Sequence, residues 1–300
     1  MRVLLAQLAP RRGDLGANLE RLARIVAGSR VDLAVFPELY LSGYLVGDRI
    51  HRLALASGDP MWTQLGALAR QTGTAVAVGA PVALASRRGE TLNAVLLATP
   101  DGEVRVQEKR YLPTYGPFDE GATFTPGDAS RPLEVGHASI GFEVCYDAFF
   151  PEVSRALALG GADLLVVLSA APVTSGPLFE KVLPARAVEN ACPLVYVNRV
   201  GVEDGIVFGG SSAAWDARGE RIPPSPSALP DAIGPEESVG VVEVDIADAA
   251  RWRPSRPVLR DVSARPSRHE PPRATAPSTT RHRRPGPRGT QRRPRRPGRR

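Results

Sequence analysis

The hydrophobic pattern of residues 1–263 switches between the two-residue period of strands and the 3.6-residue period of helices. Short apolar runs rich in valine and leucine, such as residues 164–168 (LLVVL), are typical of strands that are buried on both faces. Residues 18–28 (NLERLARIVAG) instead place apolar side chains on one helical face and end on a glycine. The chain is therefore predicted to alternate strands with amphipathic helices.

The same pattern predicts further helices at residues 61–71, 151–159 and 178–190. Residues 92–99 and 104–108 flank Pro100-Asp101-Gly102, a turn sequence of the kind that joins hairpin strands. Alternating helices and strands combined with hairpins indicate a layered α/β fold with mixed sheets. The predicted strands are residues 2–7, 33–36, 75–79, 92–99, 104–108, 139–144, 164–168, 194–198, 206–208, 212–216 and 240–244.

Charge is distributed unevenly, because residues 264–300 hold 13 arginines and one acid, Glu270. This segment is also rich in proline and has almost no apolar side chains to bury, so we expect a disordered tail after a single domain at residues 1–263. A polybasic tail has the charge to bind nucleic acid weakly, and a protein that binds a partner through this tail is the non-enzyme alternative. The remaining residues carry a net negative charge, and we look for the function there.

Several classes of site find no support in the sequence. The only two cysteines, Cys145 and Cys192, form neither a disulfide framework nor a zinc pattern, so a cytoplasmic location is expected. No apolar run approaches the roughly 18 residues that cross a bilayer. Neither a glycine-rich nucleotide motif nor a metal-ligand spacing occurs, and we expect no cofactor, no metal and no membrane partner.

Three polar residues, Glu38, Lys109 and Cys145, each follow a predicted strand. A carboxylate among apolar neighbours suits a general base, a lysine ammonium is a compact positive charge, and a thiol at a strand-to-helix turn is placed to act as a nucleophile. Taken singly, these residues also fit ordinary roles as a surface acid, a solvent-exposed lysine and a small buried hydrophobe. We assign the last of these roles to Cys192.

In this order along the chain, the three residues resemble the carbon–nitrogen hydrolase family, also called the nitrilase superfamily. The resemblance extends over residues 2–262, and it is specific because many separate motifs agree. These motifs are FPEL (36–39), EKRYLPTYGPFDEG (108–121), GFEVCYD (141–147), ARAVEN (185–190), VNRVG (197–201), FGGSS (208–212) and RPVLRD (256–261).

The resemblance implies a four-layer α-β-β-α sandwich with two mixed sheets, which usually pairs into a homodimer. It implies Cys145 as the nucleophile, Glu38 as the general base and Lys109 as the cation beside the tetrahedral intermediate. Glu120 matches the second glutamate of many members, which positions the substrate and supports the lysine. The Tyr146 backbone N–H can then help to hold the developing oxyanion. The residues assigned to substrate binding are Tyr115, Tyr146 and Ala170.

Two local features indicate which branch of the family the chain resembles. Nitrile-cleaving members typically carry Cys-Trp-Glu at the nucleophile, whereas this chain has Cys145-Tyr146-Asp147, which is similar to the amidase branches. The loop around Glu120 is most similar to the glutaminase domain of glutamine-dependent NAD synthetases, yet their usual N-A-S-P stretch is Ser169-Ala170-Ala171-Pro172 here. We therefore expect a stand-alone amidase that cleaves a small linear amide through a cysteine thioester and releases ammonia or an amine. The alternatives are an ammonia-supplying glutaminase subunit, a nitrilase and an N-carbamoyl hydrolase.

Overall fold

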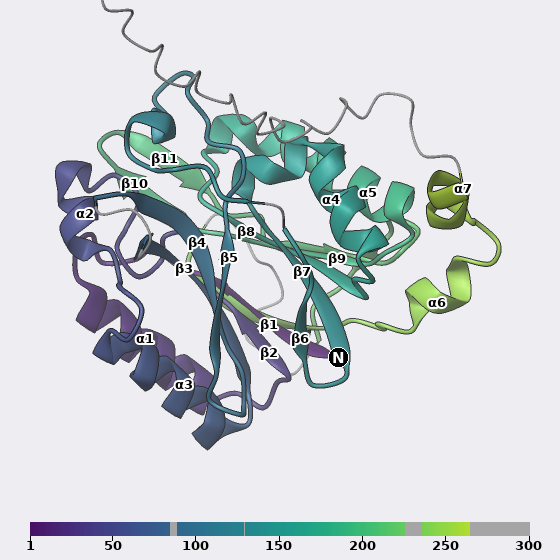
Figure 1. The fold of residues 1–300 in the computed structure, drawn as a ribbon, viewed down its shortest axis with the longest axis horizontal. Coiled ribbons are helices and arrows are strands. Elements are labelled where there is room, and N and C mark those ends of the chain that lie inside the picture. The colour runs from purple at the N-terminus through teal and green to yellow at the C-terminus, as the bar shows by residue number, and fades with distance from the viewer. Residues whose placement is uncertain (85–88, 129, 226–235, 265–300) are drawn as a thin grey trace, which may run out of the picture. The chain divides into compact units, whose positions relative to one another are not determined.

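The computed structural model describes residues 1–84, 89–128, 130–225 and 236–264, and these form two six-stranded sheets and a separate hairpin (Figure 1). In the first sheet the strand order is β14 (Ser238–Glu243), β1 (Arg2–Gln7), β2 (Leu33–Val35), β3 (Ala75–Ala83), β4 (Thr91–Ala98) and β5 (Val104–Glu108). In the second sheet it is β13 (Arg221–Ile222), β12 (Ala213–Trp215), β9 (Leu194–Asn198), β8 (Leu164–Ser169), β7 (Ala138–Val144) and β6 (Leu133–Val135). The hairpin consists of β10 (Val200–Glu203) and β11 (Ile206–Gly209).

Both sheets are mixed. Strands β1, β2 and β3 run parallel to one another in the first sheet, as do β7, β8 and β9 in the second. The outer strands of each sheet are antiparallel to their neighbours. The prediction of two mixed sheets is therefore confirmed.

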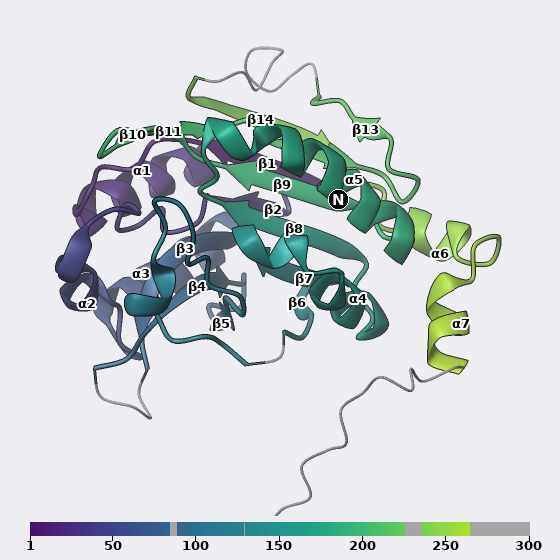
Figure 2. The ribbon, with the colours of Figure 1, turned by 90° about the horizontal axis from the view of Figure 1, so that it is seen from above.

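Helices cover the outer face of each sheet. Helices α1 (Leu15–Ala27) and α3 (Pro60–Thr72) pack on the first sheet, and α4 (Pro151–Leu159) and α5 (Gly176–Asn190) pack on the second (Figures 1 and 2). One apolar core fills the space between the sheets, and one more lies under each helical layer. The domain is thus the four-layer α-β-β-α sandwich that the resemblance implied.

Strand β8 shows why the apolar runs are nearly continuous. Leu164, Val166 and Leu168 face the core between the sheets, whereas Leu165 and Val167 face the helices α4 and α5. Since successive side chains of a strand point to opposite faces, a strand covered on both faces has no position for a polar residue that faces water. The LLVVL run is the direct consequence of this double burial.

The long elements match the prediction, and so do the short strands β2, β11 and β12, whereas several other short elements were missed. Helix α1 begins at Leu15, where the side chain of Asp14 accepts a hydrogen bond from the Ala17 N–H, and it ends before Gly28 as expected. The sequence pattern did not reveal three short helices or three short strands. These elements are α2 (Ile50–Leu53), α6 (Asp248–Trp252), α7 (Val258–Ala264), β6, β10 and β13.

The expected domain boundary at residue 263 falls within α7, whose last residue is Ala264. The arginine-rich segment that was expected to be a disordered tail lies outside the described residues from residue 265 onward. Among the residues that the structure describes, no helix is long and apolar enough to span a membrane.

Candidate active site

Three strand ends bring the predicted polar residues into one site. Glu38 lies in the loop after β2, Lys109 directly follows β5 of the same sheet, and Cys145 directly follows β7 of the second sheet. The loop that carries Glu38 lies against Gly79 of β3, where an added Cβ atom would stand 2.5 Å from the Glu38 Cα atom. Glycine at this position therefore allows the two backbones to approach closely enough to hold Glu38 inside the site.

The side chains of Glu38, Lys109 and Glu120 form a buried charged cluster. The Lys109 Nζ atom donates to Glu38 Oε1 at 2.6 Å and to Glu120 Oε1 at 2.8 Å. The side chains of all three residues are at most 4% exposed. Burying these charges is tolerable only because each one has a partner of opposite sign at hydrogen-bond distance.

Neighbouring groups fix the orientation of the Glu38 carboxylate. Asn93 of β4 donates from Nδ2 to Glu38 Oε1 at 2.7 Å, and the backbone N–H of Ala170 donates to Glu38 Oε2 at 2.8 Å. Both oxygens are therefore occupied, and the carboxylate has one defined position. Sequence reasoning missed Asn93, although a polar residue inside the apolar run TLNAVLLA was a weak signal.

Burial and neighbouring charges shift the pKa values of Lys109 and Glu120 in opposite directions. Burial alone would lower the pKa of Lys109, but the negative charges of Glu120 and Glu38 outweigh it and raise that pKa, so the ammonium form persists. Burial raises the pKa of the Glu120 carboxyl. The Tyr44 hydroxyl donates to Glu120 Oε1, whereas Glu120 Oε2 is buried and has no hydrogen-bond partner among the described residues. This oxygen thus keeps an unused capacity to accept a hydrogen bond.

Cys145 occupies a sharp turn between β7 and α4. It begins the 3-10 turn Cys145–Phe149 and has a φ of +48°, a left-handed conformation that is uncommon for a residue with a side chain. Burial raises the pKa of its thiol, and the negative charge of Glu38 raises it further. The thiol is therefore protonated at neutral pH, and attack by its sulfur requires a base that accepts the proton.

Asp147, the third residue of the Cys-Tyr-Asp motif, connects the nucleophile turn with the segment after Lys109. Its carboxylate accepts backbone hydrogen bonds from Val144 at 3.1 Å, from Tyr111 at 2.9 Å and from Arg110 at 3.2 Å. Burial raises its pKa to about 6 although these donors and Lys109 oppose the shift. Sequence reasoning used Asp147 only to choose the family branch and missed this structural role.

A small aromatic pocket opens in front of Cys145. The three residues assigned to substrate binding, Tyr115, Tyr146 and Ala170, all line it, so the structure brings them together with Cys145. The Tyr115 side chain lies at the edge of the pocket and is half exposed, and its ring contacts that of Tyr146 at 5.4 Å between centroids. The other aromatic residues in the wall are Tyr44, Phe118, Phe149 and Phe179.

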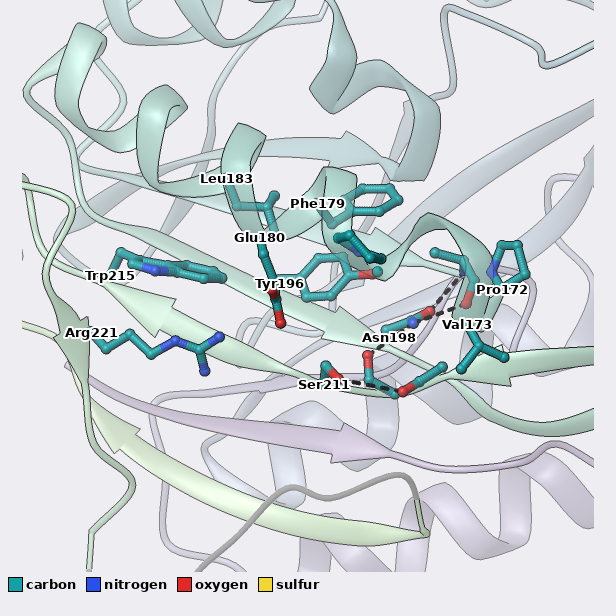
Figure 3. Close-up of a pocket in the computed structure, with 15 residues that line it drawn as sticks. Pro172, Val173, Phe179, Glu180, Leu183, Tyr196, Asn198, Ser211, Trp215 and Arg221 are labelled. Carbon is teal, nitrogen blue, oxygen red and sulfur yellow. Dashed lines mark hydrogen bonds between the residues drawn. The ribbon is translucent and has the colours of Figure 1, made fainter.

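A second, larger pocket adjoins the first along the N-terminal half of α5. The two pockets share Ala171, Pro172 and Phe179 in their walls. Figure 3 shows the ring of Tyr196 in the middle of this second pocket, between Trp215 on one side and Asn198 on the other.

Glu143 of β7 is a buried acid two residues before the nucleophile, and sequence reasoning assigned it no role. Its side chain faces the helical layer, and burial raises its pKa from 4.5 to about 8, with a further contribution from the charge of Asp147. Ser154 and Arg186 act in the opposite direction. The folded state holds this proton more tightly than the unfolded state, in which the carboxyl has its ordinary pKa of 4.5. The stability that Glu143 contributes is therefore lost as the pH rises from this pKa to the folded-state pKa of about 8.

We expect Glu143→Gln to become progressively more stable than the wild type as the pH rises from 5 to 9. The neutral amide has no ionisation to suppress, so the difference in the free energy of unfolding should move in favour of the variant by roughly 3–5 kcal/mol over this range. Chemical denaturation at several pH values measures this difference. Glu152→Gln, on the exposed side of α4, is the control. A difference for Glu143→Gln that stays constant with pH would contradict the prediction.

Comparisons with known proteins give a consistent result. The family described as carbon-nitrogen hydrolase matches residues 2–254. An (R)-stereoselective amidase from Pseudomonas sp. is 35% identical over 266 residues, which cover 87% of this chain and 91% of the relative. The glutamine-dependent NAD(+) synthetase of Rhodobacter capsulatus is 36% identical over 84% of this chain, but the matched part is only 45% of that longer enzyme.

A solved structure adds information on the cysteine. A mutant of the amidase from Nesterenkonia sp. AN1 matches with a TM-score of 0.71 and 31% identity, over 87% of this chain and 95% of that chain. That structure shows covalent addition of the acetamide moiety of fluoroacetamide at the active site cysteine. The fold, the matched family and the relatives agree, and the chain therefore belongs to the carbon–nitrogen hydrolase family and is a hydrolase that acts on C–N bonds.

Proposed function

We propose that this enzyme cleaves small linear amides through a thioester on Cys145 and releases ammonia or an amine. The observation that carries the proposal is the buried cluster of Glu38, Lys109 and Glu120 beside a cysteine at the back of a small aromatic pocket. The cluster provides a base, a cation and a second carboxylate within one site, and the pocket accommodates a substrate of limited size.

In the first half of the reaction, the Cys145 sulfur attacks the amide carbon while its proton moves to Glu38. The carbonyl electrons move to the oxygen, which the Lys109 ammonium and the Tyr146 backbone N–H stabilise. The C–N bond then breaks, and the leaving nitrogen takes the proton from Glu38. An acyl group remains on the sulfur as a thioester.

In the second half, water replaces the amine in the same position. Glu38 takes a proton from this water, and the hydroxyl oxygen attacks the thioester carbon. Collapse of the second tetrahedral intermediate breaks the C–S bond, releases the carboxylic acid and returns the proton to Cys145. One base and one cation thus serve both steps, and no further reactant is needed.

Glu120 is suited to hold the substrate amide. Its Oε2 atom is buried and unpaired among the described residues, and an amide N–H is a donor that this oxygen lacks. Tyr115, Tyr146 and Ala170 then contact the remainder of the substrate from the pocket wall. This assignment supports a primary or short N-substituted amide rather than a nitrile, which has no N–H to donate.

A glutaminase that supplies ammonia to a separate synthetase is the second candidate. The observation that favours it is the 36% identity with the Rhodobacter capsulatus synthetase over the part that the two chains share. Assembly of this enzyme into a homodimer remains a prediction from the sequence, as does weak binding of nucleic acid by the arginine-rich segment.

A substrate panel tests the proposal directly. Release of ammonia is measured with acetamide, propionamide, glutamine, a short aliphatic nitrile and an N-carbamoyl amino acid. We expect turnover to be fastest with the short amides, because they fit the small pocket and present an N–H to Glu120. Faster turnover of the nitrile or the carbamoyl compound would contradict the proposal, and a clear preference for glutamine would support the second candidate.

A further inference from the structure

We propose that Tyr196 and Ser169 form a hydrogen-bond chain that orients and stabilises the Cys145 thiolate as it forms. In this role both are positioning residues that act through the cysteine. The inference rests on the proposed function in one respect only, which is that Cys145 reacts as a thiolate.

The two residues of this hydrogen-bond chain lie on neighbouring strands. Ser169 is the last residue of β8, and its register partner on the parallel strand β9 is Asn198, two positions after Tyr196. The Ser169 Oγ atom donates to Cys145 Sγ at 3.2 Å, and the Tyr196 hydroxyl donates to Ser169 Oγ at 3.4 Å. Both residues are buried, so neither hydroxyl exchanges these partners for bulk water.

The direction of the two hydrogen bonds matters because a serine hydroxyl has only one hydrogen. When Tyr196 donates to Ser169 Oγ, it occupies an acceptor position of that oxygen and leaves the serine hydrogen to point at the sulfur. Hydrogen bonds in such a chain polarise each other, and the bond to the sulfur gains strength from the tyrosine behind it.

The Cys145 thiolate needs this support because its surroundings oppose a negative charge. Burial and the charge of Glu38 raise the pKa of the thiol, whereas Lys109, the hydrogen bond from Ser169 and the backbone N–H of Ala170 act in the opposite direction. Of the three residues that lower the pKa of the thiol, Ser169 is the one that acts through a side-chain hydroxyl. The other titratable groups around the sulfur are Tyr44, Tyr115 and Tyr146.

Packing holds the tyrosine in place. The Tyr196 ring stacks on Phe179 of α5 with 5.2 Å between the ring centroids and 28° between the planes. The same ring forms part of the wall of the second pocket (Figure 3). Since Phe179 also lines the pocket of Cys145, the helical layer positions both the substrate wall and the start of the hydrogen-bond chain.

The experiment follows the reactivity of Cys145 as a function of pH. The rate of alkylation by iodoacetamide is measured on the Cys145 peptide by mass spectrometry, so that reaction at Cys192 does not contribute. We expect Ser169→Ala to move the midpoint of this rate upward by about one to two pH units, since a hydrogen bond to a charged group has been removed. Tyr196→Phe should move it in the same direction by a smaller amount, because it removes only the second bond of the chain.

Two further variants separate this role from a contribution to folding. Ser169→Thr keeps the hydroxyl and should keep the wild-type midpoint. Ser154→Ala removes an equally buried hydroxyl from α4 and should leave the midpoint unchanged even if it lowers the melting temperature. The pH profile of kcat/KM on a short amide should shift in parallel with the alkylation profile.

A Ser169→Ala variant that melts earlier but keeps the wild-type midpoint would overturn the proposal. If Ser169→Ala does not fold, the test uses Tyr196→Phe, which retains the ring packing. An unchanged alkylation midpoint in Tyr196→Phe would then overturn the proposal. If the alkylation midpoints shift but the enzyme hydrolyses no amide, the role of the hydrogen-bond chain is supported and the proposed function is rejected. If the enzyme hydrolyses amides but the midpoints do not shift, the proposed function is supported and the role of the hydrogen-bond chain is rejected.

Discussion

Cys145→Ala should abolish amide hydrolysis, with a loss of turnover on the order of 10⁴-fold or more, because the variant has no atom that can form the thioester. The change removes only the sulfur from a partly exposed residue, and the fold should persist. Steady-state release of ammonia measures the loss. Mass spectrometry of the wild-type enzyme, quenched with acid during turnover of a short amide, should reveal an acyl adduct on the Cys145 peptide, since the thioester is an intermediate of every turnover.

Cys192→Ala is the matched control for this prediction. Cys192 is completely buried between α5 and β9, and its Sγ atom lies 3.5 Å from the Ala162 carbonyl oxygen. Its buried position confirms the structural role that the sequence indicated. The control variant should lose some stability and keep its rate. Full activity in Cys145→Ala, or an adduct found on Cys192 alone, would refute the assignment of the nucleophile.

Lys109→Met should lower kcat by about 10²–10³-fold, which corresponds to roughly 2.7–4 kcal/mol of transition-state stabilisation from one oxyanion partner. The variant also leaves Glu38 and Glu120 buried without their cation, so it should unfold more easily. Kinetic measurements therefore need a temperature at which circular dichroism shows the variant to be folded. Lys109→Arg should not restore the rate, because the wide guanidinium does not fit a site built around a compact ammonium.

The only other lysine of the chain supplies the control for this change. Lys181 lies on the exposed side of α5, and Lys181→Met should leave kcat unaltered. Because Glu38 and Lys109 serve the same transition state, the losses from Glu38→Gln and Lys109→Met should be far from additive in the double variant. A Lys109→Arg enzyme with the wild-type rate, or a loss of less than about threefold in each single variant, would disprove this joint action.

Local sequence patterns indicated a layered α/β fold with mixed sheets, and the family resemblance added the four layers and the candidate catalytic residues. Strand β8 is buried on both faces and therefore has a continuous apolar run, and α1 is buried on one face and therefore has apolar residues at helical spacing. Both elements can be predicted from these local patterns. A strand that ends at a turn also has a local signature, and from it the sequence predicts Glu38, Lys109 and Cys145 at strand ends.

Several of the shortest strands were not predictable in the same way. Strands β6, β10 and β13 have at most four residues each, which is too short for a period to be distinguished from chance. They exist because a neighbouring strand offers them backbone hydrogen bonds, as β12 does for β13. Pairing of this kind depends on residues that are distant in the sequence.

Only the tertiary structure decided which groups complete the site. Glu38 and Lys109 are 71 residues apart, and the 2.6 Å contact between them results from the register of the first sheet. Asn93 gave only a weak signal, and Tyr44 and the Ser169–Tyr196 pair had no distinguishing local pattern, because each is a single polar residue in or beside an apolar segment. Their partners come from other strands and loops, and the distance between such groups is set by strand register and sheet packing, which no local stretch of sequence encodes.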